Sequence, residues 1–206
     1  MYLADMFTGI IENIGRLVSV EQLGTGKVFW VESPLAEELH IDQSLAHNGI
    51  CLTVEEIKSG CHRVTAILET LEKTNCGSWS IGSLLNLERC LQAGGRFDGH
   101  MVQGHVDTIG TCISREDSNG SWLYCFSFPE KFAPLIIEKG SIAVNGISLT
   151  CFNVDKSSFS VAIIPYTFHH TNLNEVMPGS SVNLEFDLLG KYLQRKWSLE
   201  AENDAQ

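Results

Sequence analysis

Residues 45–54 read LAHNGICLTV, and residues 142–151 read IAVNGISLTC. The two phrases match at a constant offset of 97, and an offset of 95 aligns Gly9 with Gly104 near the start of each copy. A net insertion of two residues in the second copy accounts for the change of offset. The chain therefore contains two versions of one unit of about 90 residues, which is the signature of an internal duplication.

Each unit reads as a series of short β-strands. KVFWVES (27–33) and WLYCFSF (122–128) are rich in β-branched and aromatic residues, which favour strands. The last strand of each unit, SLLNLER (83–89) or SVNLEFD (181–187), alternates apolar and polar residues, so that one face is apolar. Many short strands in about 90 residues predict an all-β unit, either a small closed barrel or a sandwich.

We expect an N-terminal β-domain at residues 1–95, a C-terminal β-domain at 96–187 and a helical tail at 188–206. QAGGRFDG (92–99) is the expected linker between the two domains. The tail has no counterpart in the first half, and its large apolar residues fall near one helical face: Leu189, Tyr192, Leu193 and Trp197. This face is expected either to fold back on a barrel or to pack against its copies in an oligomer.

Composition excludes several classes of protein. The 14 Lys and Arg form no run and are outnumbered by 25 Asp and Glu, giving a net charge of −11, so nucleic-acid binding is not expected. The seven cysteines are scattered without a CxxC pair, which argues against disulfides and zinc and favours a reducing cytoplasm. No apolar run reaches the roughly 18–20 residues of a membrane span, and the start lacks a signal-peptide layout.

The repeated phrase carries the most informative polar residues. Asn-Gly is a tight-turn signal, and the strand that leaves it carries Cys51 and Thr53 in the first unit, Ser148 and Thr150 in the second. Residues at i and i+2 share one face of a strand. They are either small, half-buried residues tolerated by a barrel wall, or polar strips beside two equivalent pockets. Such strips would hydrogen-bond a planar heterocycle with carbonyl and ring-nitrogen acceptors.

The histidines show no metal pattern. His100 and His105 are five residues apart, which suits neither one face of a helix nor one face of a strand. When the two copies are aligned, His105 takes the position of Ile10. One His, one Cys and one Ser at equivalent or nearby positions of a duplicated fold predict a pseudo-symmetric site with two roles.

Motifs in both halves resemble those of the riboflavin synthase α-chain family: MFTGIIE, AHNGICLTV, ETLEKTN, GHMVQGHVD, IAVNGISLT and VNLEFDLLGKY. The match runs from Met6 to about Lys191, nearly the whole chain. The resemblance implies two similar six-stranded Greek-key β-barrels and a C-terminal α-helix. It further implies a cytoplasmic homotrimer built around that helix, and it leaves a lumazine synthase open as a further partner.

The resemblance implies a transferase that needs no cofactor or metal. Two molecules of 6,7-dimethyl-8-ribityllumazine react, one donating a four-carbon unit to the other, and the products are riboflavin and 5-amino-6-ribitylamino-pyrimidinedione. Two copies of one binding phrase would then hold two copies of one substrate, one as donor and one as acceptor. In the family the site forms between the N-terminal barrel of one subunit and the C-terminal barrel of its neighbour.

The family's binding positions fall on matching residues of both units. The N-terminal pocket would use Cys51, Leu52, Thr53, Thr65, Ala66, Ile67, Leu68, Glu69 and Thr70, closed by Gly104, His105 and Val106. The C-terminal pocket would use Lys139, Ser148, Leu149, Thr150, Ala162, Ile163, Ile164, Pro165, Tyr166 and Thr167, closed by Gly9, Ile10 and Ile11. Phe7 matches the family's functionally important N-terminus.

His105 is the expected proton-transfer group, and Ser148 and Cys51 are the expected nucleophile or polarising groups. One position departs from the family pattern, because Asn145 stands where many members have Asp. An amide cannot take a proton at neutral pH, so this chain would be impaired if that carboxylate were an essential base. Asn48 occupies the matching place in the first unit, which favours an amide that caps the turn.

Three other functions compete with the enzyme. Lumazine-binding antenna proteins share the family's fold and hold a lumazine or flavin without turnover, but they would need only one intact pocket. A flavin-domain barrel of the oxidoreductase type would need a nicotinamide domain, for which 206 residues leave no space. A purely structural protein would leave the doubled polar strip without a reason.

Overall fold

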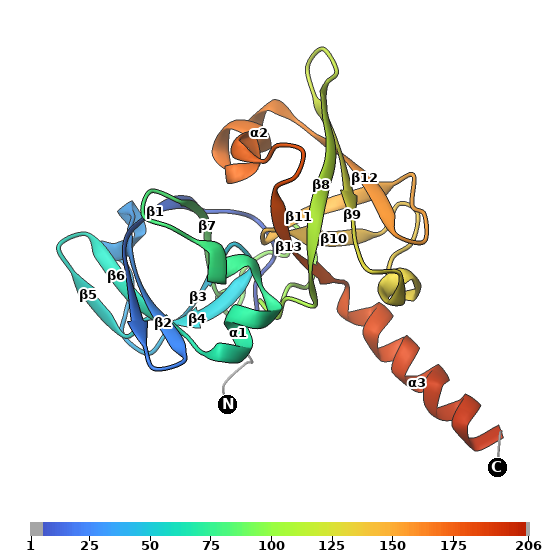
Figure 1. Ribbon diagram of the computed structural model, residues 1–206, viewed down its shortest axis with the longest axis horizontal. Coiled ribbons are helices and arrows are strands. Elements are labelled where there is room, and N and C mark those ends of the chain that lie inside the picture. Colours follow the sequence, from blue (N-terminus) through green and yellow to red (C-terminus); the bar gives the residue numbers. More distant parts are fainter. Residues whose placement is uncertain (1–5, 205–206) are drawn as a thin grey trace.

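The computed structural model describes residues 6–204 and contains two β units followed by a helix (Figure 1). The first unit has strands β1 (Asn13–Leu23), β2 (Gly26–Glu32), β3 (Ser44–His47), β4 (Ile50–Thr53), β5 (Glu56–Lys58), β6 (Cys61–Ala66) and β7 (Leu84–Arg89). Its short helices are η1 (Pro34–Glu37), α1 (Leu68–Lys73) and η2 (Asn75–Ser78).

The second unit repeats this order without a counterpart of β5. Its strands are β8 (Thr108–Asp117), β9 (Trp122–Ser127), β10 (Ser141–Val144), β11 (Ile147–Phe152), β12 (Ser158–Ile163) and β13 (Ser181–Phe186). Its helices are η3 (Glu130–Leu135), α2 (Pro165–His170) and η4 (Asn172–Glu175), and the chain continues into α3 (Leu188–Asp204).

The two sheets close to different extents. In the second unit the order β10-β11-β12-β9-β8-β13 forms a closed barrel. In the first unit the order is β4-β3-β7-β1-β2-β6-β5, and the gap between β4 and β6 is bridged just beyond β4 by the Glu55 N–H, which donates to the Arg63 carbonyl at 2.9 Å. The predicted all-β fold of two similar units and a C-terminal helix is confirmed. The second unit is the expected closed six-stranded barrel, whereas the first is a seven-stranded sheet that closes only in part.

The repeated phrase builds the two central hairpins, β3–β4 and β10–β11. Each turn has positive φ at both central residues, 48° and 75° at Asn48 and Gly49 and 46° and 79° at Asn145 and Gly146, as the Asn-Gly signal predicts. The hairpins meet back to back, since a Cβ on Gly49 would lie 2.7 Å from the Gly146 nitrogen and the reverse contact is equal. The duplicated turns therefore lie where the two units meet.

The final strand of each unit is buried on both faces. Leu85 and Leu87 of β7 point into the first core, as the alternation predicts. Their polar neighbours Asn86 and Glu88, however, are only 1% and 4% exposed. The polar face of β7 is covered by the start of its own unit, which bonds to Glu88, and by the other half of the chain, where Asn172 bonds to Asn86. The polar face of β13 is covered in the same two ways, and the pattern of a single strand does not reveal this.

Helix α3 projects away from both β units (Figure 1). Its apolar residues are largely exposed: Leu189 71%, Tyr192 70%, Leu193 48% and Trp197 61%. The alternative in which this face folds back on a barrel is therefore not what the structure shows. No helix among residues 6–204 is long and apolar enough to cross a membrane.

Candidate active site: two pockets closed by crossed segments

The C-terminal pocket is an open cavity of about 490 Å³ against the outside of β11 and β12. Its lining contains eight residues of the predicted set: Lys139, Ser148, Leu149, Thr150, Ala162, Ile163, Ile164 and Thr167. Pro165 and Tyr166 follow in the first turn of α2, beside this wall. Phe152 also lines the cavity, with the Lys139 ammonium 5.2 Å from its ring centre, and the sequence did not suggest it.

The rim of this pocket comes from the start of the chain. The Ser148 N–H donates to the Gly9 carbonyl at 2.8 Å, so Gly9 lies directly against the polar strip. Gly9 has a φ of 77°, and a Cβ on it would lie 2.6 Å from the Ser148 Cβ. Only glycine fits this backbone and this contact. Ile10 beside it is 46% exposed, and Ile11 packs against the second core.

His100 completes the surroundings of Ser148. Its Nδ1 lies 2.7 Å from the Ser148 Oγ, and its backbone N–H donates to the Thr8 carbonyl at 3.1 Å. Burial lowers the pKa of His100, which favours the neutral ring that can accept the hydroxyl proton. Sequence reasoning missed this pair, because His100 lies 48 residues from Ser148 and repeats no motif of the first unit.

The residues predicted for the N-terminal pocket repeat this rim contact. The Cys51 N–H donates to the Gly104 carbonyl at 2.9 Å. Gly104 has a φ of 77°, and a Cβ on it would lie 2.6 Å from the Cys51 Cβ. The Phe7 ring lies behind Gly104, fully buried, and Val106 packs against the first core. In each unit, the strand that carries Cys51 or Ser148 is thus bonded to the opening segment of the other unit.

The predicted wall of the N-terminal pocket is assembled from β4, β6 and α1. Leu52 and Ala66 are buried in the first core, so only their backbone faces outward, whereas Thr53 is exposed. The Thr65 hydroxyl donates to Glu55 at 2.8 Å. Farther along this wall, Ile67 and Leu68 are exposed apolar residues. Glu69 is paired with Lys73, and the Thr70 carbonyl accepts the Thr74 hydroxyl.

The three predicted catalytic residues do not gather at one point within a single chain. His105 and Cys51 lie on either side of Gly104, and the His105 side chain is exposed. Ser148 belongs to the other pocket, where its partner is His100. A site that uses all of them must combine the two pockets.

The two units differ in charge at matched positions near the repeated strand. At the offset of 97, Asp42 of the first unit matches Lys139 of the second, and Glu55 matches Phe152. Asp42 and Lys139 share a positive φ, 70° and 64°, and each donates its N–H to a carbonyl at 2.9 Å. The same backbone therefore presents an acidic side chain in the first unit and a basic one in the second.

Two buried carboxylates hold the rim segments. We define the first rim segment as residues 7–12 and the second rim segment as residues 102–107. Glu88 of β7 accepts the N–H groups of Thr8 and Gly9 at 2.7 and 3.0 Å. Burial raises the pKa of Glu88 to about 7, against the opposing effect of these backbone donors.

Glu185 of β13 does the same for the second rim segment. It accepts from the backbone of Gln103, Gly104 and His105 at 2.7, 3.0 and 3.0 Å, and burial raises its pKa to about 7. Glu88 and Glu185 match at the offset of 97, but the sequence alone suggests no role for them. A charged residue repeated in the middle of a strand was the signal that could have found them.

Asn145 lies where the two units meet, outside the lining of the C-terminal pocket. Its Oδ1 accepts the Asn183 N–H at 2.9 Å, just as the Asn48 Oδ1 accepts the Asn86 N–H at 2.7 Å. Asn172 bonds to both turns, donating to the Asn48 Oδ1 at 2.9 Å and accepting from the Asn145 amide at 3.4 Å. This geometry supports the turn-capping interpretation of the amide.

The described part of the chain contains no cluster of three or more side chains suited to hold a metal ion. The polar side chains and apolar walls of the C-terminal cavity are suited to hydrogen bonding, proton transfer and the binding of a planar ligand.

Comparison with known proteins agrees with the duplicated pocket. The family model described as "Lumazine binding domain" matches the chain twice, at residues 8–90 and 103–187. A riboflavin synthase of Actinobacillus pleuropneumoniae is 40% identical over 92% of this chain and 89% of its own length. A riboflavin synthase of Bacillus subtilis is 36% identical over 98% of this chain and 94% of its own length.

Solved structures with this fold contain bound ligands. LumP complexed with riboflavin has a TM-score of 0.82 and 19% identity, covering 87% of this chain and 98% of that one. LumP complexed with 6,7-dimethyl-8-(1'-D-ribityl) lumazine has a TM-score of 0.80 at the same identity and coverage. At this identity the similarity establishes the fold.

Proposed function

The chain belongs to the riboflavin synthase family, and we propose that it converts two molecules of 6,7-dimethyl-8-ribityllumazine into riboflavin and 5-amino-6-ribitylamino-pyrimidinedione. One lumazine donates a four-carbon unit to the other. The observation that carries the proposal is the doubled rim contact, in which a glycine of the other unit's opening segment lies against Cys51 in one unit and against Ser148 in the other. A protein that held a single ligand would need only one of these contacts.

The reaction requires little from the protein beyond the positioning of its two substrates. The C7 methyl of a lumazine is unusually acidic, because its anion delocalises into the ring. Holding two lumazines face to face supplies proximity and orientation, which contribute roughly 7–11 kcal/mol in favourable cases. The remaining need is for a modest base, a nucleophile or proton donor, and fixed dipoles at the pyrimidine carbonyls.

The side chains divide these roles between the pockets. His105 transfers protons beside Cys51, and Ser148 acts as nucleophile or polarising group with His100 as the acceptor of its proton. The 2.7 Å contact between the His100 Nδ1 and the Ser148 Oγ supports this addition to the predicted trio. The Lys139 ammonium on the cavity wall stabilises negative charge on the molecule in the C-terminal pocket.

We extend the proposal to assembly and location. The protein works as a homotrimer around α3, with each site formed by the N-terminal pocket of one subunit and the C-terminal pocket of the next. The uncovered apolar face of α3 supports this arrangement. The protein acts in the cytoplasm, and its domains are residues 1–95 and 96–187 with the helical tail at 188–206.

The test is to mix the purified protein with 6,7-dimethyl-8-ribityllumazine alone, in the presence of a chelator, and to follow absorbance. One riboflavin should appear for every two lumazines consumed. Single replacements of His105, Cys51, Ser148 and His100 by Ala should lower turnover. Binding of one lumazine per chain without riboflavin would contradict the proposal and favour an antenna protein.

A further inference from the structure

The two rim segments are fixed by matching contacts, and the match extends to their last residue. Glu12 ends the first rim segment and accepts the Arg89 N–H at 2.7 Å. Asp107 ends the second rim segment and accepts the Phe186 N–H at 2.8 Å. The offsets of 95 and 97 pair Glu12 with Asp107 and Arg89 with Phe186, so the duplication preserves the backbone contact.

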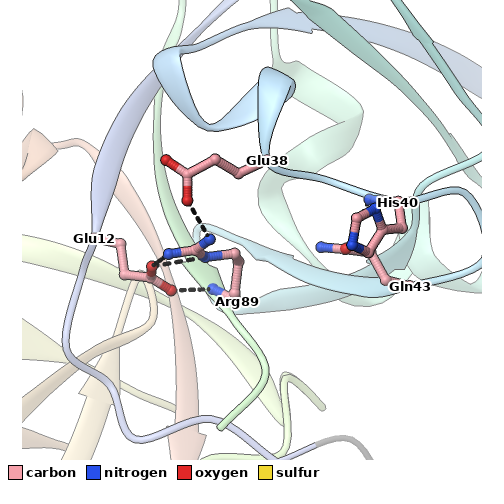
Figure 2. Close-up of polar contacts among 5 residues, drawn as sticks. All are labelled: Glu12, Glu38, His40, Gln43 and Arg89. Carbon is pink, nitrogen blue, oxygen red and sulfur yellow. Dashed lines mark hydrogen bonds and ion pairs between the residues drawn. The ribbon is translucent and has the colours of Figure 1, made fainter. Parts of the chain in front are cut away.

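The cation that pairs with this carboxylate is not preserved. In the first unit it is Arg89 itself, from β7, with 2.6 Å to Glu12 and 2.8 Å to Glu38 (Figure 2). In the second unit position 186 is Phe, and the cation is Lys191 of α3, 2.6 Å from Asp107. The second rim segment is therefore held from outside its barrel, by the helix.

The pair between Asp107 and Lys191 is better shielded from solvent than the pair between Lys196 and Glu200 of α3. The two side chains are 18% and 22% exposed, whereas those of Lys196 and Glu200 are 69% and 55% exposed at 3.6 Å. Partly buried pairs are screened less by water and salt than exposed ones. Lys191 also lies about 200° around the helix from Leu193, so it faces away from the apolar face.

We propose that Asp107 and Lys191 are positioning residues that couple α3 to the N-terminal pocket. Lys191 fixes the end of the second rim segment, Glu185 fixes its middle, and the Gly104 carbonyl holds the Cys51 N–H. A shift of α3 is thereby passed to the residues that surround Cys51 and His105. The other face of the same helix remains available for contacts between subunits.

The inference deepens the proposed function, because the pocket concerned is one of its two substrate pockets, but its test does not depend on turnover. The readout is the rate at which iodoacetamide alkylates Cys51, followed by mass spectrometry, with the half-buried Cys125 as internal reference. The variants are Asp107→Asn, which can still accept the Phe186 N–H, and Lys191→Met, which keeps the helix. Lys196→Met removes an exposed cation of the same helix, and Arg89→Met loosens the first rim segment instead.

We expect Cys51 to react at least about threefold faster in Asp107→Asn and in Lys191→Met, the scale expected for loss of one partly buried charge pair. Cys125 should keep its rate in all variants, and Lys196→Met and Arg89→Met should leave Cys51 unchanged. The double variant should react no faster than either single one, since the two changes remove the same contact.

An unchanged Cys51 rate in both single variants would overturn the inference, and so would equal acceleration in Lys196→Met. If Lys191→Met also disturbs assembly, Asp107→Asn decides, because its change lies on the rim segment and not on the helix. A wild-type protein that makes no riboflavin while the variants still accelerate Cys51 would contradict the proposed function and leave the coupling intact. If the wild type makes riboflavin while the Cys51 rate is unchanged in the variants, the proposed function stands and the coupling is contradicted.

Discussion

Asn145 is the residue at which the sequence raised the sharpest doubt, since an amide cannot act as a base. Its Oδ1 is engaged with the Asn183 N–H, in the same way as the Asn48 Oδ1 with Asn86. We predict that Asn145→Ala lowers the free energy of unfolding by about 1–3 kcal/mol, the cost of leaving a buried donor unsatisfied.

The same variant should keep its turnover per folded chain within about twofold, because no transition-state contact is removed. Chemical unfolding and the lumazine assay measure the two effects separately. Asn48→Ala is the matched control and should lose similar stability. A large fall in turnover for Asn145→Ala alone would restore a catalytic role at this position.

A second residue-scale prediction concerns the histidine pair in the first core. His47 and His62 are fully buried, with 2.8 Å between their Nε2 atoms, and the His47 Nδ1 donates to the Leu45 carbonyl at 3.0 Å. With His62 donating to His47, the His62 Nδ1 has no hydrogen-bond partner within residues 6–204, so a proton on that nitrogen would be buried without an acceptor. Both rings are therefore neutral.

Burial lowers the pKa of His47 well below its ordinary value and that of His62 to about 4. A histidine whose pKa is lower in the folded state contributes full stability above its unfolded pKa of about 6.5 and loses it as the pH falls. We predict that His62 costs the wild type up to about 3 kcal/mol between pH 6.5 and 4, relative to His62→Gln. Urea unfolding at four pH values measures the difference, and parallel curves for the two proteins would refute it.

At the scale of the element, the rim segments matter more than their lack of regular structure suggests. Gly9 lies in the left-handed region and against Ser148, so a methyl group there would strain the backbone and push the segment off the pocket. We predict that Gly9→Ala weakens riboflavin binding to the C-terminal pocket by at least about tenfold, the equivalent of about 1.4 kcal/mol.

Gly24→Ala separates backbone strain from the steric clash with the pocket. Gly24 also has a positive φ, 58°, but a Cβ on it would have no atom within 4 Å. It should leave riboflavin affinity unchanged. Fluorescence titration of both variants provides the measurement. Equal affinities for Gly9→Ala and the wild type would show that the first rim segment does not form part of the pocket.

The elements that the sequence predicted well are those with local signals. The Asn-Gly turns, the alternation of Leu85 and Leu87, and the terminal helix all follow from neighbours in the chain. The buried roles of Glu88 and Glu185 do not, because their partners lie about 80 residues away in segments without periodicity. The pairing of His100 with Ser148 was out of reach for the same reason.

At the scale of the whole molecule, duplication explains why the pockets are crossed. The first rim segment starts the chain and closes the second barrel, and the second rim segment follows the linker and closes the first. The two segments pair with each other at Phe7 and Val102, whose N–H groups donate at 2.7 and 3.1 Å. Each barrel therefore takes a backbone contact at its repeated strand from the opening segment of the other half of the chain.

Within a single chain Cys51 and Ser148 lie in separate pockets, so assembly is the step that brings two substrates together in the proposed reaction. The apolar face of α3 should mediate that assembly, since its side chains are exposed in the single chain. We predict that Leu193→Glu breaks the oligomer and lowers turnover at least about a hundredfold, because two lumazines are no longer held face to face.

Binding of riboflavin to the separated chains should remain, since the rim contacts lie within one chain. Ser198→Glu places the same charge on the opposite side of the helix and should keep both oligomer and turnover. For the two variants, sedimentation velocity measures the oligomeric state, fluorescence titration measures riboflavin binding, and the lumazine assay measures turnover. Full turnover in a monomeric Leu193→Glu protein would mean that both substrates meet within one chain, and the subunit-interface site would have to be abandoned.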